Sequence, residues 1–174
     1  MGKVFTFLVL AGVLWAGVAA AQSAAGAASG SGETVTNTVL ARVPIEDVTG
    51  HELVQSTGLD QFATPDPIAG VSFQGAQMKT HSQSDLVDGS GLVRGYGVWQ
   101  AASGERLFLT YGYRIPPRTP ATSEIVPFEG SFEWTGGTGR LEKVRGSGTI
   151  EGRIARNGRA TYRWSGTYRE VVGP

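Results

Sequence analysis

The feature that most constrains this chain is a two-residue rhythm of apolar and polar side chains in its second half. Over residues 107–113, every second side chain is leucine or tyrosine, and similar alternation recurs over 128–134 and 161–168. Because successive side chains of a β-strand project to opposite faces of its sheet, each segment is expected to form a strand with one apolar face. Residues 33–174 show no apolar residues at helical spacing over several turns, so an all-β fold is predicted.

Turn-forming residues separate these segments. Asp88-Gly89 and Asn157-Gly158 are typical of two-residue hairpin turns, because the central positions of such turns favour residues that accept a positive φ. Prolines exclude a strand over 116–123, where a loop is expected. The expected strands are 51–57, 71–86, 92–101, 106–114, 125–134, 145–154 and 160–171, with a further short strand at 34–40 left open.

Strands joined mainly by hairpins predict a single antiparallel up-and-down β-barrel of about eight strands. Closure of such a meander removes the exposed sheet edges that a soluble protein must otherwise protect. A two-sheet β-sandwich is the alternative, because sequence patterns separate the two architectures poorly. Glycines inside the strands favour the barrel, since they often mark bends or close contacts between backbones.

The N-terminal segment has the pattern of an export signal. A lysine precedes an uncharged apolar run, and small residues at Ala19 and Ala21 fit a cleavage site. We therefore predict a signal peptide over 1–21 and export to a bacterial periplasm or the medium, with an uncleaved membrane anchor as the alternative. Residues 22–32 contain only Gln, Ser, Ala and Gly and predict a flexible leader. One domain without a membrane span is then expected over 33–174.

The composition excludes several kinds of site. The chain contains no cysteine, which rules out disulfides, thiolate nucleophiles and Cys-based zinc sites. Its histidines, His51 and His81, do not have the spacing of a metal site, so neither a metal nor a cofactor is predicted. The formal net charge is zero, but the stretch from Arg140 onward is rich in arginine. These arginines alternate with apolar residues, as on the wet face of strands, and nucleic acid is not an expected partner of an exported protein.

Two segments resemble a known family. Residues 128–152 contain Trp-Thr-Gly-Gly-Thr-Gly-Arg between two expected strands, and residues 164–168 read Trp-Ser-Gly-Thr-Tyr. They resemble the strand–turn–strand segment and the closing strand of the allene oxide cyclase and dirigent superfamily of β-barrels. The resemblance implies a barrel that cyclises or isomerises a small hydrophobic molecule, or orients it for coupling, without a cofactor. Independently of this resemblance, Gly146, Gly148 and Gly152 leave room for bulky neighbours on one face of their strand.

Aromatic residues are the candidates for lining a ligand cavity. Such pockets are mostly apolar with a few polar groups, and Tyr and Trp supply both. Plain core packing is the other interpretation of the same residues. The predicted ligand-binding residues are Tyr96, Trp99, Tyr111, Tyr113, Trp134, Tyr162 and Trp164.

Glu129 and Glu133 are the candidate catalytic residues, because they share one face of an expected strand. If that face points inward, the two carboxyl groups could carry out proton transfer, and Arg163 could pair with them across the sheet. A solvated outer face is the alternative, and it would leave the pair without a catalytic role.

Two functions are consistent with this sequence. The first is an exported barrel that binds a small hydrophobic molecule in its lumen, with cofactor-independent cyclisation or isomerisation left open. The second is a non-catalytic exported barrel that binds a partner or a polymer through its outer surface. The size and lining of the barrel interior distinguish them. A homo-oligomer is compatible with either function.

Overall fold

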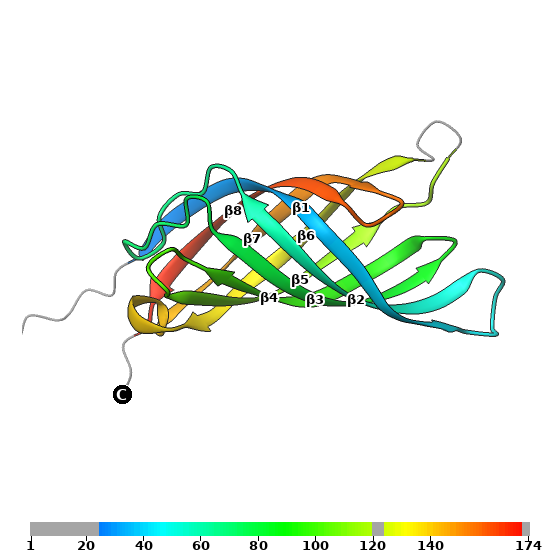
Figure 1. The fold of residues 1–174 in the computed structure, drawn as a ribbon, viewed down its shortest axis with the longest axis horizontal. Coiled ribbons are helices and arrows are strands. Elements are labelled where there is room, and N and C mark those ends of the chain that lie inside the picture. Colours follow the sequence, from blue (N-terminus) through cyan, green and yellow to red (C-terminus); the bar gives the residue numbers. More distant parts are fainter. Residues whose placement is uncertain (1–24, 120–123, 172–174) are drawn as a thin grey trace, which may run out of the picture.

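The structure, a computed structural model, describes residues 25–119 and 124–171. These residues form a closed barrel of eight antiparallel strands arranged in the order in which they follow one another (Figure 1). The predicted up-and-down barrel is therefore confirmed. The strands are β1 (Ala25–Pro44), β2 (His51–Phe62), β3 (Gln77–Val87), β4 (Ser90–Gln100), β5 (Arg106–Ile115), β6 (Ile125–Gly137), β7 (Val144–Ala155) and β8 (Ala160–Glu170), and a short 3-10 helix, η2 (Gly139–Leu141), lies between β6 and β7.

Strand β1 closes the ring and is longer than the short strand expected at 34–40. Its residues 25–33 pair with residues 161–169 of β8, and its residues 32–44 pair with residues 52–62 of β2. The prediction of a flexible leader over 22–32 is therefore wrong from residue 25 onward. The predicted signal peptide over 1–21 lies outside the described residues.

Small residues at the start of β1 are needed for this closure, because aromatic rings of β8 lie across the strand. A Cβ atom on Gly30 would stand 2.7 Å from the Trp164 ring, and one on Gly32 would stand 2.8 Å from the Tyr162 ring. Carbon atoms in favourable contact are roughly 3.5–4.0 Å apart. The composition that suggested a leader is therefore what allows β1 to pack beneath these rings.

The glycines of β7 play the same part beneath the aromatic rings of its neighbour β6. A Cβ atom on Gly148 would stand 2.4 Å from the Phe132 ring, and one on Gly152 would stand 2.9 Å from the Phe128 ring. The predicted room for bulky neighbours on this strand is confirmed. Glycines on one strand and aromatic rings on the next thus share the inner face of the barrel wall.

One end of the barrel, called the plugged end below, carries the connection between β2 and β3, and the other end carries the turns between β1 and β2, β3 and β4, and β7 and β8 (Figure 1). The connection between β2 and β3, residues 63–76, covers the plugged end and places Ile68 and Phe73 in the core with no exposed surface. The strand predicted over 71–86 is therefore correct only from Gln77. Its first residues belong to the plug, which an alternation of apolar and polar residues does not distinguish from a strand.

Five large aromatic residues pack together next to this plug. The ring centroids of Trp99 and Trp164 are 5.0 Å apart, and those of Phe62 and Trp99 are 4.3 Å apart. Most of these contacts are tilted or edge-to-face, the geometry that aromatic quadrupoles favour. We call this cluster the aromatic floor. It consists of Phe62, Phe73, Trp99, Trp134 and Trp164.

Arg140 of η2 fastens the connections at the plugged end. Its guanidinium donates hydrogen bonds to both carboxylate oxygens of Glu105, at 3.0 and 2.8 Å, and to the Gly70 carbonyl at 3.1 Å. Glu105 lies between β4 and β5, and Gly70 lies in the plug. The Gly-rich turn between β6 and β7 therefore serves to hold two other connections in place.

This ion pair should make the stability of the barrel sensitive to acid. Hydrogen bonds from Arg140 lower the pKa of Glu105 from 4.5 to about 2. Because the folded-state pKa is depressed, the stabilisation is present above about pH 4.5 and is lost as the pH falls toward about 2. We expect Arg140→Met to melt at a lower temperature than the wild type near neutral pH, with a smaller difference at about pH 3. Thermal melts followed by circular dichroism would check this, and a difference that does not shrink in acid would contradict it.

Candidate functional site

The barrel encloses a cavity of about 720 Å³ that extends from the aromatic floor to the hairpin turns. This volume falls within the range of roughly 300–1,000 Å³ that is typical of small-molecule sites. Side chains from all eight strands line it, because alternate residues of each strand point inward. The interior of the barrel is thus only partly filled by its own side chains.

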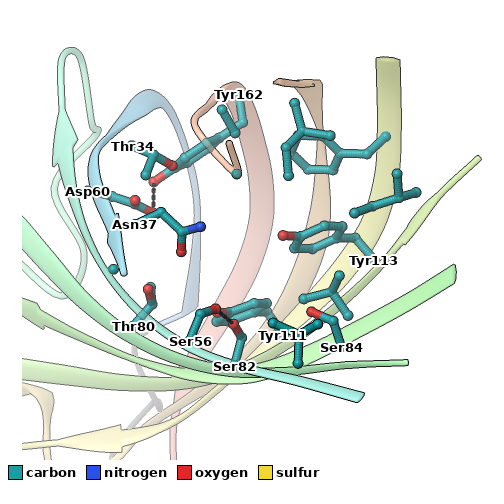
Figure 2. Close-up of a pocket in the computed structure, with 18 of the residues that line it drawn as sticks. Thr34, Asn37, Ser56, Asp60, Thr80, Ser82, Ser84, Tyr111, Tyr113 and Tyr162 are labelled. Atoms are coloured by element: carbon teal, nitrogen blue, oxygen red, sulfur yellow. Dashed lines mark hydrogen bonds between the residues drawn. The ribbon is translucent and has the colours of Figure 1, made fainter. Parts of the chain in front are cut away.

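Strands β1, β2 and β3 supply most of the polar side chains that line the cavity, beside apolar ones such as Val54 and Met78. The Oγ atoms of Ser56 on β2 and Ser82 on β3 lie 2.8 Å apart and hydrogen-bond to each other. Figure 2 shows the hydroxyl groups gathered on this side of the cavity. The polar wall consists of Thr34, Asn37, Ser56, Asp60, Thr80, Ser82 and Ser84.

Strands β5 to β8 supply an apolar wall that faces the polar wall. The rings of Tyr111 and Tyr113 are stacked with centroids 6.2 Å apart, and Phe128 lies 4.7 Å from Tyr113. A molecule that contacts both walls needs an apolar body and a polar group. The apolar wall consists of Leu109, Tyr111, Tyr113, Ile115, Phe128, Phe132, Ile150, Ile154 and Trp164.

Asp60 is the buried acid of the polar wall. Only 7% of the residue is exposed, and its Oδ2 accepts a hydrogen bond from the Tyr162 hydroxyl at 3.0 Å (Figure 2). Burial raises the pKa of the Asp60 carboxyl from 3.8 to about 6, and hydrogen bonds from Tyr162 and Thr34 oppose this rise only in part. A carboxyl group with such a pKa can both accept and release a proton near neutral pH.

Three tyrosine hydroxyls lie within reach of the Asp60 charge. Burial raises the pKa of Tyr111 to about 12 and raises the pKa of Tyr113 and Tyr162 above the usual range of a phenol. The negative charge of Asp60 adds to each of these rises. All three hydroxyls therefore remain neutral at physiological pH, and Asp60 supplies the negative charge of this part of the cavity.

Charged side chains of both signs surround the mouth of the cavity. Arg42 forms an ion pair with Glu52 across the β1–β2 hairpin. Arg156, at the turn between β7 and β8, lies 3.8 Å from Glu124. Among the described residues, no basic side chain contributes to the pKa shift of Asp60. The other charged residues that line the mouth are Asp88 and Arg118.

The structure places most of the predicted ligand-binding residues in the barrel interior. Trp134 belongs to the aromatic floor and is 1% exposed, but it does not line the cavity. For this residue, the alternative interpretation of core packing holds. The predicted residues that do line the cavity are Trp99, Tyr111, Tyr113, Tyr162 and Trp164.

Three other predicted site residues lie on the outer face of the barrel. Tyr96 is 69% exposed on β4. Glu129 and Glu133 are exposed on β6, because the inward positions of that strand are taken by aromatic residues such as Phe132. The prediction that these three residues serve a lumenal site is therefore wrong. Arg163, the proposed partner of the two glutamates, is also exposed on the outer face.

Sequence reasoning missed Asp60 and the polar wall. On β2 the inward positions are Val54, Ser56, Gly58, Asp60 and Phe62. They repeat every second residue, but their mixture of polar and apolar types hides the inner face. A signal for Asp60 was present, because every second residue from Val54 to Phe62 lies on the same face of the strand as these two apolar residues.

His51 joins two carboxylates near the mouth without lining the cavity. Its Nδ1 lies 2.5 Å from Asp47 and its Nε2 lies 2.8 Å from Asp85, and these hydrogen bonds raise the pKa of the imidazole. Within the described part of the chain, no three His, Asp or Glu side chains are grouped so that they could hold a metal ion. Residues 25–119 and 124–171 also contain no helix with the length and hydrophobicity needed to cross a bilayer.

Comparison with known proteins gives a similar fold and no functional assignment. No family model matches this sequence, and no curated protein matches it. Among solved structures, the barrel is similar to a Shewanella oneidensis MR-1 protein of unknown function that belongs to the DUF3224 family. The TM-score is 0.52 and the sequence identity is 12%. The match covers 87% of this chain and 100% of that chain. At this identity the likeness concerns architecture alone, so this chain shares its fold with a DUF3224 protein.

Proposed function

We propose that this protein binds a small, largely hydrophobic molecule inside its barrel. The observation that carries the proposal is the cavity of about 720 Å³ with one apolar and one polar wall. Binding in such a cavity removes apolar ligand surface from water, while a few polar groups fix the orientation of the ligand. A lumen filled by side chains would instead favour binding through the outer surface.

In a cyclase or isomerase reaction of the kind implied by the resemblance to allene oxide cyclases, Asp60 would be the group that transfers the proton. Glu129 and Glu133 lie outside the cavity, whereas Asp60 is buried in its wall beside the Tyr162 hydroxyl. The raised pKa of Asp60 suits proton transfer near neutral pH without a cofactor. Ligand binding is the primary proposal, and catalysis is an extension of it.

We place this activity outside the cytoplasm. The basis is the predicted signal peptide over 1–21, with its apolar run and its small residues before the expected cleavage site. Mass spectrometry of the N-terminus of the mature protein from its own host would test this directly. An uncleaved N-terminus would count against export through this signal.

A lumen-blocking variant tests the binding proposal. We expect the wild type to bind the apolar dye Nile red, and we expect the double variant Ser56→Leu/Ser82→Leu to bind it at least about tenfold more weakly. The two serines hydrogen-bond to each other, and the Tyr111 hydroxyl, which also hydrogen-bonds to Ser82, keeps Thr80 as a partner. Replacing both serines therefore adds apolar volume to the cavity without leaving a hydroxyl unpaired. Fluorescence titration with the dye measures the affinity.

The matched control places the same substitutions outside the barrel. Ser131 and Ser147 are exposed on β6 and β7, so Ser131→Leu/Ser147→Leu should bind the dye as the wild type does. Equal dye binding by the lumen-blocked and wild-type proteins, with both folded by circular dichroism, would contradict a lumenal site. If the lumen-blocked variant binds the dye more weakly, native mass spectrometry of the wild type from its own host would identify the natural ligand. That ligand should be absent from the lumen-blocked variant.

A further inference from the structure

We infer that the ligand of this cavity is a monocationic amine with an apolar body, whose ammonium group binds the Asp60 carboxylate. This inference rests on the proposed lumenal function and names the chemical class of the ligand. It follows from the position of Asp60, from the hydrogen-bonding groups around it and from the wall that faces it.

Among residues 25–119 and 124–171, no basic side chain lies beside the Asp60 carboxylate inside the barrel. Asp60 is 7% exposed, and the donors to its carboxyl group are the neutral hydroxyls of Tyr162 and Thr34. The basic residues that line the cavity lie at the mouth, on the β1–β2 hairpin, the β5–β6 loop and the β7–β8 turn. A buried carboxylate gains most from an opposite charge, so the missing cation is supplied best by a ligand.

The groups around Asp60 match the donors of an ammonium ion. A carboxylate has about four acceptor sites, and two hydroxyls leave some of them free for a ligand. An ammonium group has three donors and no acceptor, and Ser56 and Thr80 on the same wall offer further hydroxyl oxygens (Figure 2). Gly58, between Ser56 and Asp60 on the inward side of β2, adds no side chain to this space.

The apolar wall also favours a cation over an anion. Aromatic faces carry partial negative charge, so the rings of Tyr113 and Phe128 attract a cation and repel a carboxylate. The negative charge of Asp60 acts on Tyr111, Tyr113 and Tyr162 alike and raises the pKa of each hydroxyl, so it extends over this side of the cavity. An aliphatic or aromatic body fits against the remaining apolar side chains.

Arginines at the mouth support the competing class of ligand, a molecule with a carboxylate head at the rim and its tail in the lumen. Arg42 is already paired with Glu52, and Arg156 lies near Glu124. Asp88 adds a further negative charge at the same rim. The rim is therefore mixed in charge, whereas the charged side chain that the described residues place deep in the cavity is the acidic Asp60.

Three straight-chain ligands with nine carbon atoms each distinguish these classes. At about pH 8, where Asp60 is ionised and an alkylamine is protonated, we expect nonylamine to bind at least about tenfold more tightly than nonanol or nonanoate. Displacement of Nile red from the full-length protein measures all three affinities. Asp60→Asn should remove the preference for nonylamine and retain the binding of nonanol, because the isosteric amide keeps the volume of the cavity.

The control and the contradicting outcomes are separate from those of the proposed function. Glu129→Gln removes a carboxylate from the outer face and should preserve the preference for nonylamine. Nonanol or nonanoate binding as tightly as nonylamine would overturn the amine assignment while leaving lumenal binding intact. A preference for nonylamine that survives Asp60→Asn would overturn the role of Asp60. Failure of the wild type to bind the dye or any of the three ligands would overturn the proposed function itself.

Discussion

Replacing Trp99 with alanine should lower the free energy of unfolding by about 3–5 kcal/mol. Trp99 is 3% exposed and is the residue through which the aromatic floor is connected. Its ring centroid lies 4.3 Å from that of Phe62, 5.4 Å from Phe73 and 5.0 Å from Trp164. Its indole N–H also donates to the Met78 sulfur at 2.8 Å. Deletion of the ring would leave a void between the plug and the cavity that the surrounding strands cannot fill.

The same strand provides the control for this substitution. Tyr96 is 69% exposed on the outer face of β4, so Tyr96→Ala should change stability by about 0.5 kcal/mol or less. Urea unfolding followed by circular dichroism measures both values. Comparable losses for the two variants would show that the aromatic floor does not carry the stability that we assign to it.

Asp60→Asn should stabilise the barrel near neutral pH by roughly 2–3 kcal/mol. Burial raises the pKa of the Asp60 carboxyl from 3.8 to about 6, so the folded protein binds a proton more tightly than the unfolded chain. The ionised carboxyl therefore destabilises the fold fully above about pH 6, and this penalty disappears as the pH falls below 3.8. Asparagine keeps an oxygen that accepts the Tyr162 hydrogen bond and carries no charge.

The pH dependence distinguishes this effect from a change in packing. The gain in stability of Asp60→Asn over the wild type should be largest at about pH 8 and should be close to zero at about pH 3. Glu129→Gln, on the exposed face of β6, should show no comparable gain. A loss of stability in Asp60→Asn that is the same at both pH values would mean that the charge of the carboxyl does not oppose folding.

The barrel could be predicted because most of its strands have one apolar and one polar face. On β6, Phe128 and Phe132 alternate with the exposed Glu129 and Glu133, and the apolar set points inward as the alternation requires. Strand β8 repeats the pattern with inward Tyr162 and Trp164. The same rule favoured the outer face for the glutamates, and the structure places them there.

The rest could not be predicted because the inner face of this barrel is not uniformly apolar. On β4 the inward positions on either side of Tyr96 are Gly95 and Gly97, so the tyrosine between them points outward. Gly95 is small because the Tyr111 ring of β5 lies over it, at 2.5 Å from where a Cβ would stand. That requirement comes from the neighbouring strand and cannot be seen within β4 alone.

Closure of the ring by β1 and β8 has a consequence for how this chain folds. Seven of the eight strand pairs join neighbours along the chain and can form as successive hairpins, whereas the last pair joins the first strand to the final one. Contacts between distant parts of a chain form slowly, because the entropy of closing the intervening loop must be lost first. Until β8 has been synthesised, the first strand has an unpaired edge that can associate with other chains. We therefore expect pairing of β1 with β8 to limit the folding rate.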